Sequence, residues 1–199
     1  IYGTVGELAN GRLGSRLSNL RMNLVDGVSV EFWLKKSEFI TGSTEREVVL
    51  DLWNGELSSS ADYGRLTLDL KGDEALGANP IRLTLQSGTY GFSNQSIGSS
   101  TITTSSIADN NWNHYAVTMN SASSGVGVSL YVNGALDNTL TAGSTGIGEI
   151  TGSLVANIGA LRTYPSGAST SILEGDGKLS GSLDEFRYWK TLRTEEDVS

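Results

Sequence analysis

Residues 110–119, with the sequence NNWNHYAVTM, hold the side chains of this chain best suited to acid–base chemistry. Trp112, His114 and Tyr115 lie close together, and Asp109 stands directly before the stretch. His114 is the single histidine among 199 residues. A histidine near a carboxylate can act as a general acid or base close to neutral pH. Whether this stretch forms an active site depends on the elements that position it.

The composition excludes several classes of function. With 14 basic and 22 acidic residues the net charge is -8, which opposes contact with the backbone of a nucleic acid. The absence of cysteine excludes disulfides, thiolate metal sites and cysteine nucleophiles. No apolar run of about 18 residues is present, so we expect no membrane insertion. The sequence also lacks a Gly-x-Ser-x-Gly elbow, a His-Glu-x-x-His motif and a phosphate-binding glycine loop.

An alternation of apolar and polar residues dominates the chain and predicts β-strands. In residues 28–35 it places Phe32 and its apolar neighbours on one face, and Trp33 with serine, glutamate and lysine on the other. The same pattern predicts strands at residues 65–70, 81–86 and 126–132. Residues 47–53 are apolar enough for an inner strand.

Turn signals separate these strands. Asn133-Gly134 is suited to the positive φ angles of a two-residue type I′ hairpin. Four segments rich in glycine, serine, asparagine or aspartate are interpreted as loops: 58–64, 72–80, 91–100 and 141–149. The one helix start is Thr194, near the end of the chain. We therefore predict a single all-β domain over residues 1–199, with two antiparallel sheets and a short C-terminal helical turn. Because the chain starts at Ile1 without a signal peptide, we expect it to be part of a longer polypeptide.

Five motifs occur in the order and approximate spacing of a known family. They are VSVEFWLKK (28–36), NNWNHYAVTM (110–119), SLYVNGALDNT (129–139), ANIGALR (156–162) and GSLDEFRYWKTLRTEED (181–197). The chain resembles laminin-G-like domains, which belong to the concanavalin A-like jelly rolls. Residues 10–23 match the first strand of that family poorly. The resemblance implies a jelly-roll sandwich that displays loops or a sheet face to a ligand.

The resemblance also implies a structural role for the opening stretch. It implies that the indole of Trp112 closes the edge of the sandwich. It also implies that His114 braces a loop. A buried indole removes roughly 150–250 Å² from water, worth several kcal/mol at about 25 cal/mol per Å². Asp109 is interpreted as a turn residue whose side chain bonds the local backbone. We therefore expect no catalytic residue in this stretch.

Hydrolysis needs a separate test, because glucanases share this sandwich. Those enzymes carry Glu-x-Asp-x-x-Glu on an inner strand, which directs acids into one cleft at glycosidase separation. The nearest match is Glu174-Gly-Asp176, which lacks a third acid and lies among glycines. Glu45 and Glu47 are also two positions apart, but Arg46 lies between them and no third acid follows. The sequence therefore predicts that the chain is not an enzyme.

Asp184 is the carboxylate most in need of an explanation. In simple alternation it shares a face with Phe186 and Tyr188, and if that face is inward the acid requires a partner. One interpretation is that it accepts backbone N–H bonds and fixes the last strand. The other is a structural Ca²⁺ site, as in related jelly rolls, with Asp26 and Asp176 as further ligands.

Exposed aromatic residues are the candidates for ligand binding. Trp53, Tyr90, Phe92 and Tyr164 each have glycine, asparagine or proline neighbours, which suggest loop exposure. Local packing beneath a loop is the competing interpretation for each of them. These residues would present ring surfaces to a glycan or a protein.

Three functions remain open from the sequence. The first is a non-catalytic carbohydrate-binding or cell-adhesion module of a larger extracellular or virion-surface protein. The second is an architectural module, which spaces or decorates a phage capsid or fibre and contacts neighbouring domains or subunits. The third is a glycoside hydrolase. The absence of cysteine favours a bacterial or phage surface protein over an animal matrix domain, where disulfides are usual.

Overall fold

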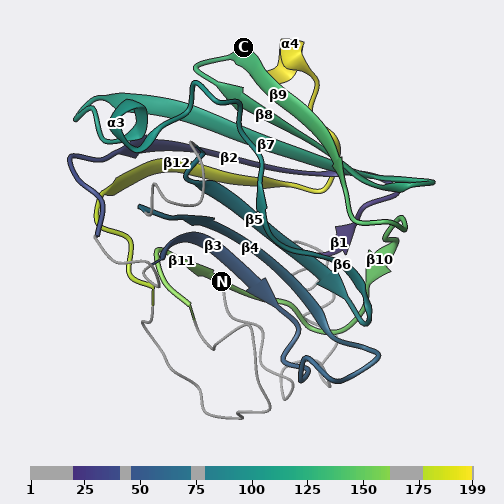
Figure 1. The fold of residues 1–199 in the computed structure, drawn as a ribbon. Coiled ribbons are helices and arrows are strands. Elements are labelled where there is room, and N and C mark those ends of the chain that lie inside the picture. The colour runs from purple at the N-terminus through teal and green to yellow at the C-terminus, as the bar shows by residue number, and fades with distance from the viewer. Residues whose placement is uncertain (1–19, 41–45, 73–78, 162–176, 199) are drawn as a thin grey trace.

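Two five-stranded antiparallel sheets stack face to face (Figure 1). The computed structural model describes residues 20–40, 46–72, 79–161 and 177–198. The upper sheet in Figure 1, called the β2 sheet, has the strand order β12-β2-β7-β8-β9. The lower one, called the β4 sheet, has the order β11-β3-β4-β5-β6. This arrangement is the predicted jelly-roll sandwich.

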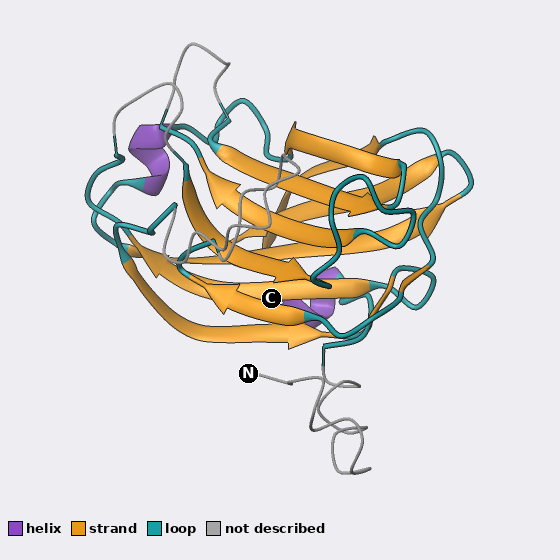
Figure 2. Ribbon diagram, turned by 90° about the horizontal axis from the view of Figure 1, so that it is seen from below, coloured by secondary structure: helices purple, strands orange, loops and turns teal. Residues whose placement is uncertain are grey.

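The strands of the β2 sheet are β2 (Val28–Lys35), β7 (Trp112–Ala122), β8 (Gly125–Val132), β9 (Ala135–Ala142) and β12 (Ser182–Trp189). Those of the β4 sheet are β3 (Glu47–Trp53), β4 (Gly64–Leu70), β5 (Ile81–Ser87), β6 (Tyr90–Ser96) and β11 (Val155–Ile158). A two-stranded sheet pairs β1 (Met22–Asn23) with β10 (Glu149–Ile150). Strands make up most of the described chain, and both helices are single short turns (Figure 2).

The core lies between the two main sheets and follows the predicted alternation. On β2 the apolar residues face inward, where Phe32 stacks on Tyr115 of β7 and on Phe186 of β12. The leucines of β4 and β5 meet them from the other sheet and are buried. Residues 47–52 are buried throughout, which confirms the prediction of an inner strand.

The predicted hairpin is confirmed. Val132 pairs with Ala135, so Asn133 and Gly134 are the two loop residues between β8 and β9. Their φ angles are 51° and 81°, the positive values that a type I′ turn requires. Asparagine tolerates this conformation and glycine adopts it without a Cβ clash, so the local sequence is sufficient to set this turn.

Two local predictions need correction or extension. Residues 91–100 were expected to form a loop, but most of them belong to β6, an edge strand of the β4 sheet. A short helix, α3 (Thr104–Ile107), precedes β7 and begins with a capping box between Thr103 and Ser106.

The predicted terminal turn is α4 (Glu195–Val198), where Asp197 accepts a hydrogen bond from the Thr194 backbone N–H. Among the described residues, no helix is long and apolar enough to cross a membrane.

Candidate functional site

The outer face of the β2 sheet carries two exposed indoles. Trp33 points outward because Phe32 and Leu34, its neighbours on β2, face the core. Trp112 begins β7 on the same outer face, opposite Lys35. Trp33 is 38% exposed and Trp112 is 44% exposed. The expectation that Trp112 is a buried indole closing the sandwich edge is therefore wrong.

His114 is the next outward residue after Trp112 on β7. It is directly opposite Trp33, and the two ring centroids are 5.3 Å apart. We call Trp112, Trp33 and His114 the aromatic strip. The expected bracing of a loop by His114 comes from its backbone N–H, which donates to Oδ1 of Asn133 at 2.8 Å. The imidazole itself faces outward.

An open pocket of about 360 Å³ adjoins the aromatic strip. Trp33 and His114 line it together with Glu31, Arg187, the Asn133-Gly134 turn, and Asp197 and Val198 of α4. These residues come from β2, β7, β12, the β8–β9 hairpin and the C-terminal helix. The pocket therefore depends on segments from the beginning, middle and end of the described chain.

The C-terminal segment forms one wall of the pocket. Val198 packs in a small apolar cluster with Ala116 and Tyr131 on the outer face of the β2 sheet. Arg193, which precedes α4, holds this segment against β2, because its Nε donates to Oε1 of Glu31 at 3.0 Å. Its guanidinium also lies 4.4 Å from the ring centre of Trp189. The wall is therefore held by both apolar and ionic contacts.

Burial and two neighbouring charges set the protonation of His114. Burial lowers the pKa of His114, the charge of Glu31 opposes this shift and that of Arg187 adds to it. The imidazole is therefore neutral at pH 7. Asp109 is not its partner, because Asp109 accepts hydrogen bonds from Asn111 and Asn113, which lower the pKa of the Asp109 carboxyl. This confirms Asp109 as a turn residue.

Comparison with known families places this chain. The laminin G-type family model, described as the concanavalin A-like lectin/glucanases superfamily, matches residues 12–199. The chain belongs to this superfamily. No curated protein matches the chain.

Solved structures are similar to this superfamily member at low sequence identity. Domains LG4-5 of the mouse laminin alpha1 chain are 9% identical, with 88% of this chain and 40% of that chain covered and a TM-score of 0.53. A heptameric SAP-like pentraxin from Limulus polyphemus is 15% identical, with 89% and 70% covered and a TM-score of 0.48. This chain thus spans well under half of the laminin chain. At such identities the likeness concerns the fold alone.

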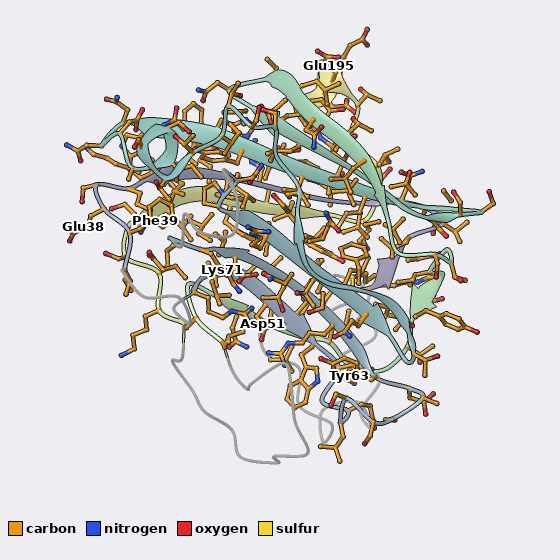
Figure 3. The ribbon with its side chains drawn as sticks, viewed as in Figure 1. Glu38, Phe39, Asp51, Tyr63, Lys71 and Glu195 are labelled. Atoms are coloured by element: carbon orange, nitrogen blue, oxygen red, sulfur yellow. The ribbon has the colours of Figure 1, made fainter. Side chains whose placement is uncertain are left out.

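Glucanases of the superfamily direct us to the carboxylates of the β4 sheet. Asp51 and Asp69 lie on the outer face of this sheet, on neighbouring strands, as diagonal neighbours about 7–8 Å apart. That spacing falls within the range of glycosidase acids. Asp51, labelled in Figure 3, is nevertheless held by Arg65, whose Nε and Nη2 donate to its two oxygens at 2.8 and 2.9 Å. Thr67 donates to it as well.

Asp69 is equally occupied. Its Oδ2 lies 3.2 Å from Nε of Arg46. Burial raises the pKa of Asp69 to about 6, and the charges of Arg46, Lys71 and Arg82 limit this rise. Both carboxylates are buried and are not accessible to a ligand in solution. Glu47 is also buried and pairs with Lys36, while Glu45, Glu174 and Asp176 lie outside the described residues. Asp51, Asp69 and Glu47 are therefore each held in an ion pair, as expected of structural carboxylates.

The aromatic residues named from the sequence do not form one platform. Trp53 is half-buried, with its Nε1 bonded to the Glu56 carbonyl and its ring 5.5 Å from the Arg65 guanidinium. Phe92 packs partly against the core, and only Tyr90 is strongly exposed, on the edge strand β6. Tyr164 lies outside the described residues. By alternation, Trp53 and the β6 aromatics point to opposite faces of the β4 sheet.

Asp184 does not face the core. A β-bulge between Asp184 and Arg187, with Glu185 at a φ of 46°, inserts one extra residue into β12. The bulge turns Phe186 inward and leaves Asp184 exposed, where it accepts a hydrogen bond from the backbone N–H of Glu185. Simple alternation could not anticipate this reversal.

The carboxylates considered for Ca²⁺ are not assembled as a set. Asp26 precedes Val28, whereas Asp184 pairs with Trp33, about 17 Å further along β2 at roughly 3.3 Å per residue. Ligands of one Ca²⁺ lie 2.3–2.6 Å from the ion, so these two acids cannot share it. Asp176 lies outside the described residues. Within the described part of the chain, no group of three or more His, Asp or Glu side chains could hold a metal ion.

Sequence reasoning missed Trp33 and Arg187 as site residues. A signal for Trp33 was present, because a tryptophan on the polar face of an alternating strand has no place in the core. Arg187 carried no comparable signal, because a charged residue on the outer face of a strand is the ordinary pattern and does not mark a site.

Proposed function

We propose that this chain is a non-catalytic binding module of a larger extracellular protein, and that it holds a glycan on the aromatic strip. The single observation that carries this proposal is the pair of exposed indoles, Trp33 and Trp112, on one sheet face beside an open pocket. Isolated exposed apolar residues are common, but two tryptophans flanking a histidine above a pocket suit a ligand. Membership of a superfamily that includes lectins supports the same function.

The exposed ring surface is large enough for weak binding. A tryptophan side chain presents about 150–250 Å², so exposures of 38% and 44% together leave roughly 120–200 Å² for a ligand to cover. At about 25 cal/mol per Å² this is worth up to about 3–5 kcal/mol. Immobilising the ligand offsets part of this gain. We therefore expect dissociation constants from millimolar to micromolar, a range typical of modules that act in several copies.

The pocket supplies the polar half of the recognition. Asn133, His114 and Arg187 carry hydrogen-bonding groups that can meet sugar hydroxyls, while the indole faces pack against the C–H face of a sugar ring. A neutral His114 can both donate and accept a hydrogen bond, which suits a hydroxyl partner.

A glycan array followed by isothermal titration tests the proposal. We expect Trp33→Ala to weaken binding of the selected glycan at least tenfold. Tyr90→Ala is the matched control, because Tyr90 is also an exposed aromatic but lies on the other sheet. Tyr90→Ala should leave binding unchanged. Loss of binding with Tyr90→Ala and not with Trp33→Ala would place the site on β6 instead.

Two alternatives are separated by the same material. An architectural module of a virion, such as a phage capsid or fibre, would bind no glycan, and Trp33→Ala would instead release it from its neighbouring subunit. The same outer face is suited to this role, since tryptophan is enriched in protein interfaces. A glycoside hydrolase would release reducing sugar from a β-glucan, and Asp69→Asn would abolish that release. We expect no such release, because Asp51 and Asp69 are buried in ion pairs.

A further inference from the structure

The aromatic strip has a direction. Ala116, His114 and Trp112 are successive outward positions on β7, so each step along the sheet is about 6.5–7 Å. Val198 of α4 covers Ala116 and so closes the strip at that end. At the other end Trp112 remains exposed. The aromatic strip is therefore closed by α4 at one end and open at the end where Trp112 lies.

The pocket belongs to the closed end alone. Trp33 and His114 line it, whereas Trp112 lies one step beyond its lining. Trp33 and Trp112 are diagonal neighbours on adjacent strands, with Cβ atoms roughly 7–8 Å apart. A ligand that fills the pocket and also covers Trp112 is longer than a single sugar ring.

The charges that line the pocket are already compensated within the protein. Glu31 pairs with Arg193, and Glu185 pairs with Arg187 at the rim. Asp197 accepts from the Thr194 backbone N–H, which lowers the pKa of its carboxyl. A charged ligand would have to break one of these pairs to gain a partner. A neutral ligand with many hydroxyl groups can accept and donate hydrogen bonds without doing so.

From these observations we propose that the ligand is the end of a neutral, extended saccharide chain. The terminal sugar occupies the pocket against α4 and packs on Trp33, and the following sugar lies on Trp112 as the chain leaves through the open end. This inference rests on the proposed function and narrows it, because it specifies chain length, charge and the part of the glycan that is recognised.

Titration with neutral oligosaccharides of one to six sugars tests the chain-length part. The probes are the cello-, laminari-, chito- and manno-oligosaccharide series. We expect affinity to rise at least tenfold from one sugar to two or three and then to level off. Affinity that does not depend on length would overturn the inference but leave the proposed function intact. Failure of every series to bind would refute both.

Two tryptophan variants assign the rise in affinity to its residue. Trp112→Ala should remove the gain with chain length while leaving the affinity for the single sugar within twofold, and Trp112→Phe should restore most of the gain. Trp33→Ala should weaken every probe equally. If Trp112→Ala weakened binding of one sugar and of long chains equally, the assignment of the second sugar to Trp112 would be contradicted. Thermal unfolding verifies that each variant is folded.

The charge and the chain end are tested with two further probes. Oligogalacturonates of matched length should bind at least tenfold more weakly than the best neutral series, and tighter binding by them would refute a neutral ligand. A long polymer of the selected sugar should bind in proportion to its chain ends rather than its mass. Binding in proportion to mass would show that the chain passes through the site and that α4 does not terminate it.

Discussion

The buried ion pair between Lys36 and Glu47 gives the sharpest test of how this sandwich is stabilised. Nζ of Lys36 lies 2.6 Å from Oε2 of Glu47 and donates to the Ser180 carbonyl at 2.7 Å. Glu47 also accepts from the backbone N–H groups of Ile40 and Ser180. Both side chains are almost fully buried. The pair therefore links Lys36 and Glu47 to Ser180, which lies 133 positions after Glu47 in the sequence.

We predict that Lys36→Met lowers the free energy of unfolding by about 3–5 kcal/mol, because it leaves the Glu47 carboxylate buried without its cation. At about 2–4 °C per kcal/mol for a chain of this length, Tm should fall by roughly 6–20 °C. Glu47→Gln should cost a similar amount, since it leaves the ammonium group uncompensated. The double variant leaves no unpaired charge at this site, so its loss should be smaller than the sum of the single losses by about 1–3 kcal/mol.

Urea unfolding of the four proteins at pH 7.5 measures this cycle. Glu185→Gln is the control, because Glu185 forms an exposed ion pair with Arg187 and should change stability by less than about 1 kcal/mol. A loss below 1 kcal/mol in Lys36→Met, or strict additivity in the double variant, would refute the reasoning.

Four further predictions concern pH, calcium and the hairpin. Burial lowers the pKa of His114 from 6.5, so wild type should lose stability relative to His114→Gln as pH falls from 7.5 to 5, whereas a gain would contradict the burial argument. Burial raises the pKa of Asp69 from 3.8 to about 6, so wild type should gain stability relative to Asp69→Asn over the same window, measured by urea unfolding. Asp184→Ala should change the free energy of unfolding by less than about 0.5 kcal/mol, because Asp184 is exposed. EDTA should leave the Tm of wild type unchanged, and a drop in Tm that Ca²⁺ reverses would reveal a calcium site. Asn133→Ala should cost about 1–2 kcal/mol in urea unfolding, because it removes the acceptor of the His114 N–H and places alanine at a φ of 51°, and a neutral result would show that the turn relaxes.

Features encoded within a few adjacent residues could be predicted from the sequence. The alternation in residues 28–35 assigned Phe32 to the core and Trp33 to the outer face, because side chains of a strand point to its two faces in turn. Asn133-Gly134 set the hairpin through the φ preferences of two residues. Strand β6 was missed because it is a half-exposed edge strand, and its glycine and asparagine content is that of a loop.

The candidate site was decided by the tertiary structure. No local pattern shows that Arg193 reaches Glu31 or that Val198 packs on Ala116, yet Glu31 and Ala116 are buried on the outer face where these contacts form, and Trp33 on the same face is exposed. In a strand without a bulge, such as β2, the sequence by itself determined which residues point away from the core. Whether such a residue is covered depends on segments far away in the chain, because burial is a property of the packed surface and not of the strand. That is why Trp112, expected inside, lies exposed to a ligand.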